Sequence, residues 1–437
     1  MSYAERLARN EIVPNVVVYF AGVYFSIRQP DSGLSVDARY NGLISRIAIN
    51  PTSIDPLRAT TTISTSSFTL LDVGNEVSKL FLSQDGFRTG QDVTIYLGRS
   101  FEDMPFSEYL AIPGGKIKGL QKVEQSYSFS TIEAKDRLNT GAFNIRSKLA
   151  VDILAATTII TLQTVENMPS AGSMKVGDEF ISWSSISGNN LVGCVRGEFG
   201  SVPSAHEAGS DVFNTIRVTS RNALDLLAQI LISGGGGGSY DVLEDGLGFS
   251  ESMVDVDQFE EVRDEFFSTH DMAFVLWGIE SVQTFLEKEI FTPLGVRLRT
   301  NNNGKIGLAL LNRNVFDLDA PVIDETVTTK APSFSVTDDK VTNRVRVSYN
   351  WSDGQNLFRS TYEQVDAASI AAYGARPFYE VQFKGVFSLA NVTSFCNLFL
   401  ARFAQARPDI GVDAFNSASN LLVGDKAELI SSKLPTF

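Results

Sequence analysis

The two histidines, His206 and His270, are the side chains on which acid–base or nucleophilic chemistry in this 437-residue chain would depend. A Ser-His-Asp or Cys-His arrangement requires one of them. His270 is followed by Asp271-Met272-Ala273-Phe274, which lacks the glutamate and the second histidine of an HExxH zinc site. We expect His206 to form a loop hydrogen bond and His270 to lie in a helical acidic stretch. Neither residue predicts a catalytic site.

Carboxylate pairs of the kind that glycosidases use occur at three places in the sequence. They are Glu260-Glu261, Asp264-Glu265 and Asp338-Asp339. Adjacent carboxylates on a helix point to different faces, so a solvated surface is the better interpretation. Four further aspartates in expected loops lack the spacing of an EF-hand calcium loop, namely Asp55, Asp72, Asp85 and Asp92. The sequence therefore predicts no catalytic, cofactor-binding or metal-binding residue, and we expect no enzyme.

The cysteine and glycine patterns likewise predict no metal-binding or cofactor-binding site. Cys194 and Cys396 lie far apart without a CxxC neighbour, so we expect two buried thiols and no disulfide framework, zinc site or iron–sulfur site. The five glycines from Gly234 to Gly238 follow an expected helix but match neither a P-loop nor a dinucleotide-binding fingerprint. They predict a flexible joint.

Composition is that of an ordinary globular chain, with 43% hydrophobic and 20% charged residues. The net charge of -14 argues against a nucleic-acid-coating protein but is compatible with a channel wall that repels DNA phosphates. No run of eighteen apolar residues predicts a membrane span, and residues 1–14 lack the apolar core of a signal peptide. We expect synthesis in a cytoplasm without export by a signal of the chain's own.

The first part of the chain reads as β structure with one helix. Val16–Phe20 and Val23–Ile27 predict a hairpin around Ala21-Gly22. Further strands are predicted at 44–49, 66–70, 93–98 and 126–134, with a turn at 112–115 and a helix at 75–82. A barrel or curled sheet with an accessory helix would bury these apolar faces.

Residues 176–212 predict a small β module. Gly177-Asp178 is a tight turn, Glu179–Trp183 alternates polar and apolar residues, and Ser187–Asn190 is a second turn. Leu191–Val195 is expected to return as the partner strand. If Trp183 were exposed, its ring would offer a stacking platform for a surface glycan; the favoured interpretation is that it fills the small core of the module.

The remaining residues mix helices and strands. Helices are predicted at 223–231, capped by Ser220 or Asn222, through most of 253–291, and at 391–405 with Val392, Phe395, Leu398, Phe399 and Phe403 inward. A stripe of Ile279, Val282, Phe285, Leu286 and Ile290 marks the clearest helical piece. A hairpin is predicted around 301–304, a strand at 341–349, and β structure from 411 to 434.

The predicted fold class is mainly β with α+β parts, in several domains with split barrels, accessory helices and a small inserted β domain. The expected domains are 1–148, a first β-barrel; 149–215, the inserted module; 216–350, a helix-rich part leading into a second barrel; and 351–437, a C-terminal β domain with one helix. The β regions before the insert and after Gly295 are compatible with a duplication.

The module resembles one that recurs in tail-tip and adhesion proteins of tailed bacteriophages. The shared phrases are a GDE strand, an L-x-G-x-x-RG return and an AH-x-AG-x-x-V end. They correspond here to Gly177, Asp178, Glu179, Leu191, Gly193, Arg196, Gly197, Ala205, His206, Ala208, Gly209 and Val212.

Over most of its length the chain is similar to the tail-tip or baseplate hub proteins of siphophages, contractile tails and gene transfer agents. The order of several phrases carries this resemblance: Arg88, Gly90, Val93, Ile95 and Gly98; Ile132–Leu138; Arg221–Leu227; Leu294–Leu308; Val341–Asn350; and Gly424–Leu429. The resemblance implies tail-tube-like barrels that continue the DNA channel.

The function implied by the resemblance is structural. A hub closes the tail tube, is commonly a trimer, and anchors the host-recognition apparatus. Implied partners are the distal tail protein, the tape-measure protein, and tail fibres or a central spike, with viral DNA passing through unbound. The expected location is the tail tip of the virion. Because the sequence stops soon after Ser431, we expect a separate protein to carry the receptor-binding tip. The alternatives are a six-copy distal tail ring protein and a carbohydrate-binding adhesion component.

Overall fold

The computed structural model describes most of the chain in two compact units. Unit 1 comprises Met1–Ile54, Thr61–Arg137 and Thr300–Lys305, and unit 2 comprises Asp55–Thr60, Leu138–Arg299 and Ile306–Phe437. The described residues are 14–20, 22–28, 30, 33–49, 54–55, 60–61, 66–83, 91–99, 106–132, 134–234, 238–301, 305–311, 322–325, 328, 330–413 and 427–432. Strands in several sheets dominate them, so the predicted mainly β, multi-domain fold class is confirmed.

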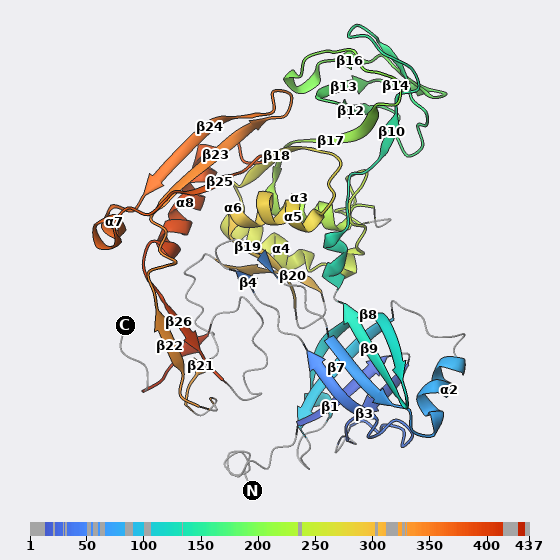
Figure 1. The fold of residues 1–437 in the computed structure, drawn as a ribbon, viewed down its shortest axis with the longest axis vertical. Coiled ribbons are helices and arrows are strands. Elements are labelled where there is room, and N and C mark those ends of the chain that lie inside the picture. Colours follow the sequence, from blue (N-terminus) through green and yellow to red (C-terminus); the bar gives the residue numbers. More distant parts are fainter. Residues whose placement is uncertain are drawn as a thin grey trace. The chain divides into compact units, whose positions relative to one another are not determined.

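Unit 1 is built on one curled antiparallel sheet (Figure 1). Its strand order is β2-β1-β7-β8-β9-β6-β3. In chain order the strands are β1 (Pro14–Phe20), β2 (Val23–Ser26), β3 (Ile44–Ile49), β6 (Ser66–Leu71), β7 (Asp92–Arg99), β8 (Leu110–Val123) and β9 (Ser126–Ile132). Two short strands, β4 (Ile54–Asp55) and β5 (Thr60–Thr61), pair with each other. The predicted hairpin at the start is confirmed, since Phe20 pairs with Val23 across Gly22.

Aromatic rings form the centre of the unit 1 core. The Phe20 ring lies 5.1 Å from Phe25, 5.5 Å from Phe68 and 5.1 Å from Phe129, measured between centroids. All four side chains are almost completely buried. Because these residues lie on β1, β2, β6 and β9, the aromatic cluster connects strands that are distant in the sequence.

One turn predicted in unit 1 is wrong. Residues 112–115 lie inside the continuous strand β8. The register with β7 shifts there, since Val93 pairs with Gly115 and Thr94 pairs with Pro113. Gly114 is therefore the extra residue of a β-bulge, and a bulge lets a strand continue through glycines that would otherwise signal a turn.

The helix predicted at 75–82 is confirmed as α2 (Glu76–Ser83). Asp72 caps its first turn, because the Asp72 Oδ1 accepts hydrogen bonds from the amides of Val77 and Ser78 at 3.1 Å each. Val77 and Leu80 are buried against the sheet core. Burial raises the pKa of Asp72, but hydrogen bonds from Ser78 and Lys122 outweigh this and lower it overall.

The small module in unit 2 has two sheets. The larger has the order β10-β17-β12-β13-β16, with β18 also pairing with β17, and the smaller has the order β11-β15-β14. The strands are β10 (Arg146–Lys148), β11 (Ile159–Thr161), β12 (Gly172–Val176), β13 (Glu179–Trp183), β14 (Ser185–Ser187), β15 (Asn190–Val192), β16 (Val195–Arg196), β17 (Asp211–Asn222) and β18 (Asp271–Leu276).

The two predicted turns of the module are present, but the expected return strand is divided. Residues 190–192 pair with β14, whereas Val195 and Arg196 pair with β13. Gly193, with a φ of +67°, separates the two pieces and redirects the chain from one sheet to the other. The predicted single strand Leu191–Val195 is therefore wrong.

Helices follow the module. They are α3 (Ala223–Ile232), α4 (Val256–Val262), α5 (Val282–Leu286) and α6 (Thr292–Leu294), with π-helical turns at Arg263–Phe267 and Glu287–Phe291. Asn222 caps α3, as one of the two predicted residues, because its Oδ1 accepts from the Leu224 amide at 3.0 Å. Gly235 to Gly237, in the predicted joint, lie outside the described residues.

The helical stretch predicted at 253–291 is interrupted by strand β18, so that part of the prediction is wrong. Met272, Phe274 and Leu276 are buried while their neighbours are partly exposed, a period of two that fits a strand. His270 accordingly lies at the turn before β18 and not in a helix. Ile279, predicted as the first residue of the helical stripe, lies outside the observed helix α5, in an isolated bridge with Ala142.

The C-terminal part contains short sheets and two helices. The sheets are β19-β20, β21-β27, β22-β26 and β24-β23-β25. The elements are β19 (Val296–Thr300), β20 (Ile306–Leu310), β21 (Val322–Ile323), β22 (Ser333–Val336), β23 (Arg344–Ser352), β24 (Leu357–Val365), α7 (Ala367–Tyr373), β25 (Tyr379–Gln382), α8 (Leu389–Phe403), β26 (Pro408–Gly411) and β27 (Glu428–Leu429). In the described residues after Gly295 no sheet exceeds three strands, so the duplicated barrel stays a prediction.

The inner face predicted for the last helix needs a correction. Val392, Phe395 and Phe399 are buried as expected, but Cys396 and Leu400 take the places predicted for Leu398 and Phe403, which are half-buried. The predicted domain limits after residues 215 and 350 fall inside β17 and β23 and stay predictions.

Both cysteines are free and buried, as predicted. Burial raises the pKa of the Cys194 thiol, and it raises that of Cys396 to about 12. No helix in the described part of the chain has the length and apolar character needed to span a bilayer.

Candidate functional site

Three segments of the module, around Glu179, Arg196 and His206, meet at the carboxylate of Glu179. This side chain, at the start of β13, is fully buried. Arg196 binds it in a bidentate manner, with Nε donating to Oε1 at 2.7 Å and Nη2 donating to Oε2 at 2.6 Å. Such fork-to-carboxylate pairs are among the strongest hydrogen-bonded contacts in proteins.

Three further groups contact this carboxylate. The Gly197 amide donates to Oε1 at 3.3 Å. The Ser204 amide donates to Oε2 at 3.1 Å, and the His206 Nε2 lies 2.8 Å from the same oxygen. Arg196 also donates to the backbone oxygen of Ser204 at 2.6 Å and to that of Leu154. Residues of the GDE, RG and AH phrases therefore contact one another in a single polar cluster around the buried Glu179 carboxylate. We call it the Glu179 cluster (Glu179, Arg196, Ser204 and His206).

The electrostatics of the Glu179 cluster favour the ionised carboxylate. Burial by itself raises the pKa of Glu179, but hydrogen bonds from Arg196, His206 and the Ser204 amide together outweigh it and hold the pKa below its usual value. The Arg196 side chain is 6% exposed, so the pair is shielded from solvent and salt. The cluster fixes the two ends of the module against β13.

The Glu179 cluster does not have the geometry of a catalytic triad. In a triad the acid and the nucleophile contact different nitrogens of the imidazole, so that a proton can be taken on one side while the other is held. Here Ser204 Oγ lies 3.2 Å from His206 Nε2, and Glu179 Oε2 lies 2.8 Å from that same nitrogen. His206 makes the loop contact that the sequence predicts, and the cluster is a structural clasp.

The other residues singled out in the sequence lie in separate structural contacts. His270 packs edge-on against Phe267 at 5.2 Å, and its backbone oxygen accepts from Ala223. Glu260 accepts from the Tyr240 hydroxyl at 2.7 Å. Within the described residues, no three His, Cys, Asp or Glu side chains are grouped so as to hold a metal ion.

The remaining carboxylates singled out in the sequence are paired with arginines, cap a helix, are exposed, or have side chains that the structure does not describe. Asp264 pairs with Arg263, which also binds Asp225, and Asp338 pairs with Arg376. Glu261, Glu265 and Asp339 are exposed. Of the four aspartates considered for calcium, Asp72 is the cap of α2; Asp85 lies outside the described residues, and the side chains of Asp55 and Asp92 are not described.

Trp183 does not offer the exposed ring that glycan stacking requires. It is 3% exposed and belongs to the module core with Met174, Ile181 and Leu191. Its indole N–H donates to the backbone oxygen of Pro169 at 3.3 Å. The structure therefore places Trp183 where the favoured sequence interpretation expects it.

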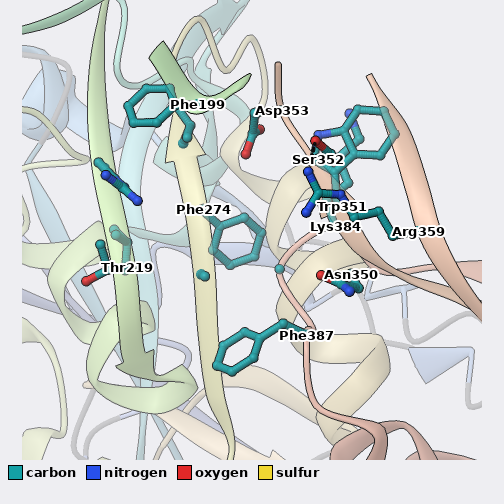
Figure 2. A pocket seen from close by; sticks show the side chains of 15 residues that line it. Phe199, Thr219, Phe274, Asn350, Trp351, Ser352, Asp353, Arg359, Lys384 and Phe387 are labelled. Carbon is teal, nitrogen blue, oxygen red and sulfur yellow. Dashed lines mark hydrogen bonds between the residues drawn. The ribbon is translucent and has the colours of Figure 1, made fainter. Parts of the chain in front are cut away.

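A cleft that the sequence did not indicate lies between β17 and β18 on one side and the β23–β24 hairpin on the other (Figure 2). Its volume is about 260 Å3. Figure 2 shows Phe199, Thr219 and Phe274 along one wall and Trp351, Ser352 and Arg359 on the opposite side, with Lys384 beside Trp351. We call it the cationic cleft, because Arg217, Arg359 and Lys384 line it together with a single carboxyl, that of Asp353.

Backbone hydrogen bonds fix the floor of the cationic cleft. The segment after β25 lies between two strands: the Ala273 amide on β18 donates to Gly385 at 3.0 Å, and the Asn350 amide on β23 donates to Val386 at 2.9 Å. The Phe274 ring lies against Gly385 so closely that a Cβ placed there would be 1.9 Å from the ring. Lys384 and Phe387 are thus carried on a segment held from both sides.

Replacing Gly385 by alanine is expected to destabilise unit 2 by about 1–3 kcal/mol, because the added methyl overlaps the buried Phe274 ring. Urea unfolding of the full chain measures this cost. Phe274→Leu provides the control: the double variant should be more stable than the sum of the two single effects predicts. Additive costs would show that the overlap with Phe274 is not the cause.

No family model matches this chain, and no curated protein sequence matches it. Its structure is similar to several solved tail proteins, each at low identity. A tail protein from Neisseria meningitidis MC58 is 9% identical, with 96% of this chain and 86% of that chain covered and a TM-score of 0.43. Prophage tail protein gp18 from Listeria monocytogenes is 9% identical, with 91% and 80% covered and a TM-score of 0.39.

A 43 kDa tail protein of prophage MuSo2 from Shewanella oneidensis is 9% identical, with 87% of this chain and 76% of that chain covered and a TM-score of 0.37. A chain in the virion of a native gene transfer agent particle covers 48% of this chain at a TM-score of 0.24.

Proposed function

We propose that this chain is a structural protein of a phage tail and that it forms the hub at the tail tip. The observation that carries the proposal is the Glu179 cluster. Three phrases shared with the tail-tip module, separated by up to 27 positions, meet within hydrogen-bonding distance of one buried carboxylate. The resemblance in sequence thus concerns residues that act together in the fold of the module.

A structural role also fits the chemistry of the residues named above. The contacts at His206 hold a loop in place, and the cysteines are buried. A hub of this kind would be a homo-oligomer, most simply a trimer, with the distal tail protein and the tape-measure protein on one side and fibres or a central spike on the other. The net charge of -14 suits a channel through which DNA passes without binding.

The copy number per particle tests the hub proposal. We expect about three copies of this chain per purified virion, measured by quantitative mass spectrometry against the tail-tube protein of the same particles. The tube protein, whose copy number is set by tail length, is the internal control. About six copies would replace the hub by the distal tail ring. Absence from the particle would contradict any structural role in the virion.

The adhesion alternative loses its sequence argument, because Trp183 is buried in the module core. The six-copy ring remains distinct from the hub only by stoichiometry, and the same experiment decides between them.

A further inference from the structure

The cationic cleft stands out because its charge is opposite to that of the chain. The protein as a whole carries a net charge of -14, yet the cleft is lined by Arg217, Arg359 and Lys384 against Asp353 alone. In the described part of the chain none of these three cations forms a salt bridge with a carboxylate, unlike Arg263, Arg346 and Arg376 elsewhere in unit 2. Asp353 interacts electrostatically with Arg217 and Lys384, but three cations face this one carboxyl, so an excess of positive charge remains for a ligand from outside.

The three cations are held in place by neutral groups. The Arg359 guanidinium donates to Ser352 Oγ at 2.9 Å and to Gln355 Oε1 at 3.3 Å. The Lys384 ammonium lies 4.3 Å from the centroid of the Trp351 ring, and the Arg217 guanidinium lies 5.0 Å from that of Phe199. Contacts with hydroxyl, amide and ring groups orient a cation without neutralising its charge.

Backbone strain at Phe199 also supports a ligand-binding role for the cationic cleft. Phe199 has a φ of +54°, which is a rare conformation for a bulky residue. This conformation presents the Phe199 ring to Arg217. The turn of the β23–β24 hairpin packs against the backbone of residues 199–201 so closely that only a glycine fits at position 354. Asn350, on the opposite wall, also has a positive φ, of +59°. Asparagine adopts this region readily, so the strain lies at Phe199, and a strained bulky residue beside a cleft is typical of a binding site.

The Trp351 and Phe199 rings of the cleft are unsuited to stacking on a sugar. Trp351 has Lys384 over its face and Phe358 at 4.8 Å between centroids. Phe199 has Arg217 over its ring and Phe180 at 5.2 Å. Trp351 and Phe199 are therefore already covered by protein groups, which leaves the three cations and the exposed Phe387 ring as the groups of the cleft that a ligand can contact.

The size of the cleft and the exposure of its cations indicate the kind of anion. A volume of 260 Å3 is below the roughly 300–1,000 Å3 of mostly apolar sites that enclose small molecules. Arg217, Arg359 and Lys384 are all exposed, on three different segments, so they form a rim and not a buried cage for one small ion. Exposed charges of this kind select and orient a partner of opposite charge at a protein–protein interface.

We propose that the cationic cleft is the docking site for an acidic polypeptide segment of a partner protein. Aspartate or glutamate side chains of that segment would enter between the two walls and pair with Arg217, Arg359 and Lys384. The proposal does not depend on the tail assignment, because it rests on the charge and geometry of the cleft alone.

Binding of a fluorescein-labelled octaglutamate peptide to the full chain, followed by fluorescence anisotropy, tests the proposal. We expect saturable binding that weakens with added NaCl, and at least about a tenfold loss of affinity in the double variant Arg359→Gln/Lys384→Gln. Lys118→Gln is the control, since it removes one exposed cation from strand β8, which does not belong to the residues that line the cleft. It should leave affinity within about twofold.

Thr219→Glu gives a second, independent variant. Thr219 is exposed on the wall formed by β17, and a carboxylate there would pair with the cleft cations and exclude the peptide. Octaglutamine is the uncharged probe and should not bind. Circular dichroism of each variant verifies that the fold is retained.

Four results would overturn the proposal. They are absence of octaglutamate binding, equal loss of affinity in Lys118→Gln and in the cleft variants, unchanged affinity in both Thr219→Glu and the double variant, and tighter binding of an eight-nucleotide oligothymidylate at the same residues. The last would indicate a site for phosphates and not for carboxylates.

Discussion

Replacing Glu179 by glutamine is expected to lower the free energy of unfolding of unit 2 by about 3–5 kcal/mol. Removing one partner of a buried ion pair leaves the other, here Arg196 at 6% side-chain exposure, with an uncompensated charge in a desolvated site. The backbone amide of Ser204 and the ring of His206 lose their charged acceptor at the same time. Urea unfolding followed by tryptophan fluorescence measures the effect, because all three tryptophans lie in unit 2 and Trp183 lies in the module core.

Glu207→Gln is the matched control for this experiment. Glu207 is exposed and next to His206 in sequence, so the same chemical change there should alter stability by less than about 0.5 kcal/mol. Equal effects of the two substitutions would show that the Glu179 cluster contributes nothing particular to the module.

The effect of Glu179→Gln should also depend on pH. Because the folded-state pKa of Glu179 lies below its usual value of about 4.5, the ionised carboxylate adds stability at neutral pH. This contribution is fully present above the unfolded-state pKa and is lost as the pH falls through the folded-state pKa. The stability difference between the wild-type chain and the variant should therefore be constant near pH 7 and shrink below about pH 4.5. A difference that grows on acidification would contradict the assignment.

Replacing Phe20 by alanine is expected to destabilise unit 1 by about 3–5 kcal/mol. The side chain is fully buried and contacts the rings of Phe25, Phe68 and Phe129, so its removal leaves a cavity at the centre of the curled sheet. All three tryptophans of the chain, at positions 183, 277 and 351, lie in unit 2, so their fluorescence does not report on this core. Hydrogen exchange of peptides covering β1, β6 and β9 is the suitable measurement.

Leu71→Ala is the control for the cavity argument. Leu71 ends β6 in the same sheet but is 38% exposed, so its truncation should cost no more than about 1 kcal/mol. If Leu71→Ala accelerated exchange as much as Phe20→Ala does, burial in the aromatic cluster would not explain the stability of unit 1.

Local patterns were sufficient for the parts of the fold in which one short segment decides its own conformation. The hairpin at Gly22 follows from alternating apolar residues on both sides of a glycine that tolerates a positive φ. The helix α3 follows from a capping Asn222 and continuous helical spacing. The mainly β class follows because strands alternate with turn residues throughout unit 1.

The errors occur where a contact distant in the sequence overrides the local signal. Gly114 and Gly115 look like a turn, but pairing with β7 keeps this part of β8 extended and makes Gly114 the extra residue of a bulge. Residues 271–276 border two helical segments and look continuous with them, but pairing with β17 draws them into a strand. Neither partner strand can be identified from the segment itself.

The sequence by itself determined which residues of the module belong together, because Glu179, Arg196 and His206 are marked by recurring phrases. Only the tertiary structure showed how they are arranged. Ser204 Oγ and Glu179 Oε2 contact the same nitrogen of His206, which is the geometry of a structural contact and not that of a proton relay. The cationic cleft was decided entirely by tertiary structure. Arg217, Arg359 and Lys384 are separated by 142 and 25 positions, and their charges add together only because β17, β24 and the segment after β25 fold to face one cavity.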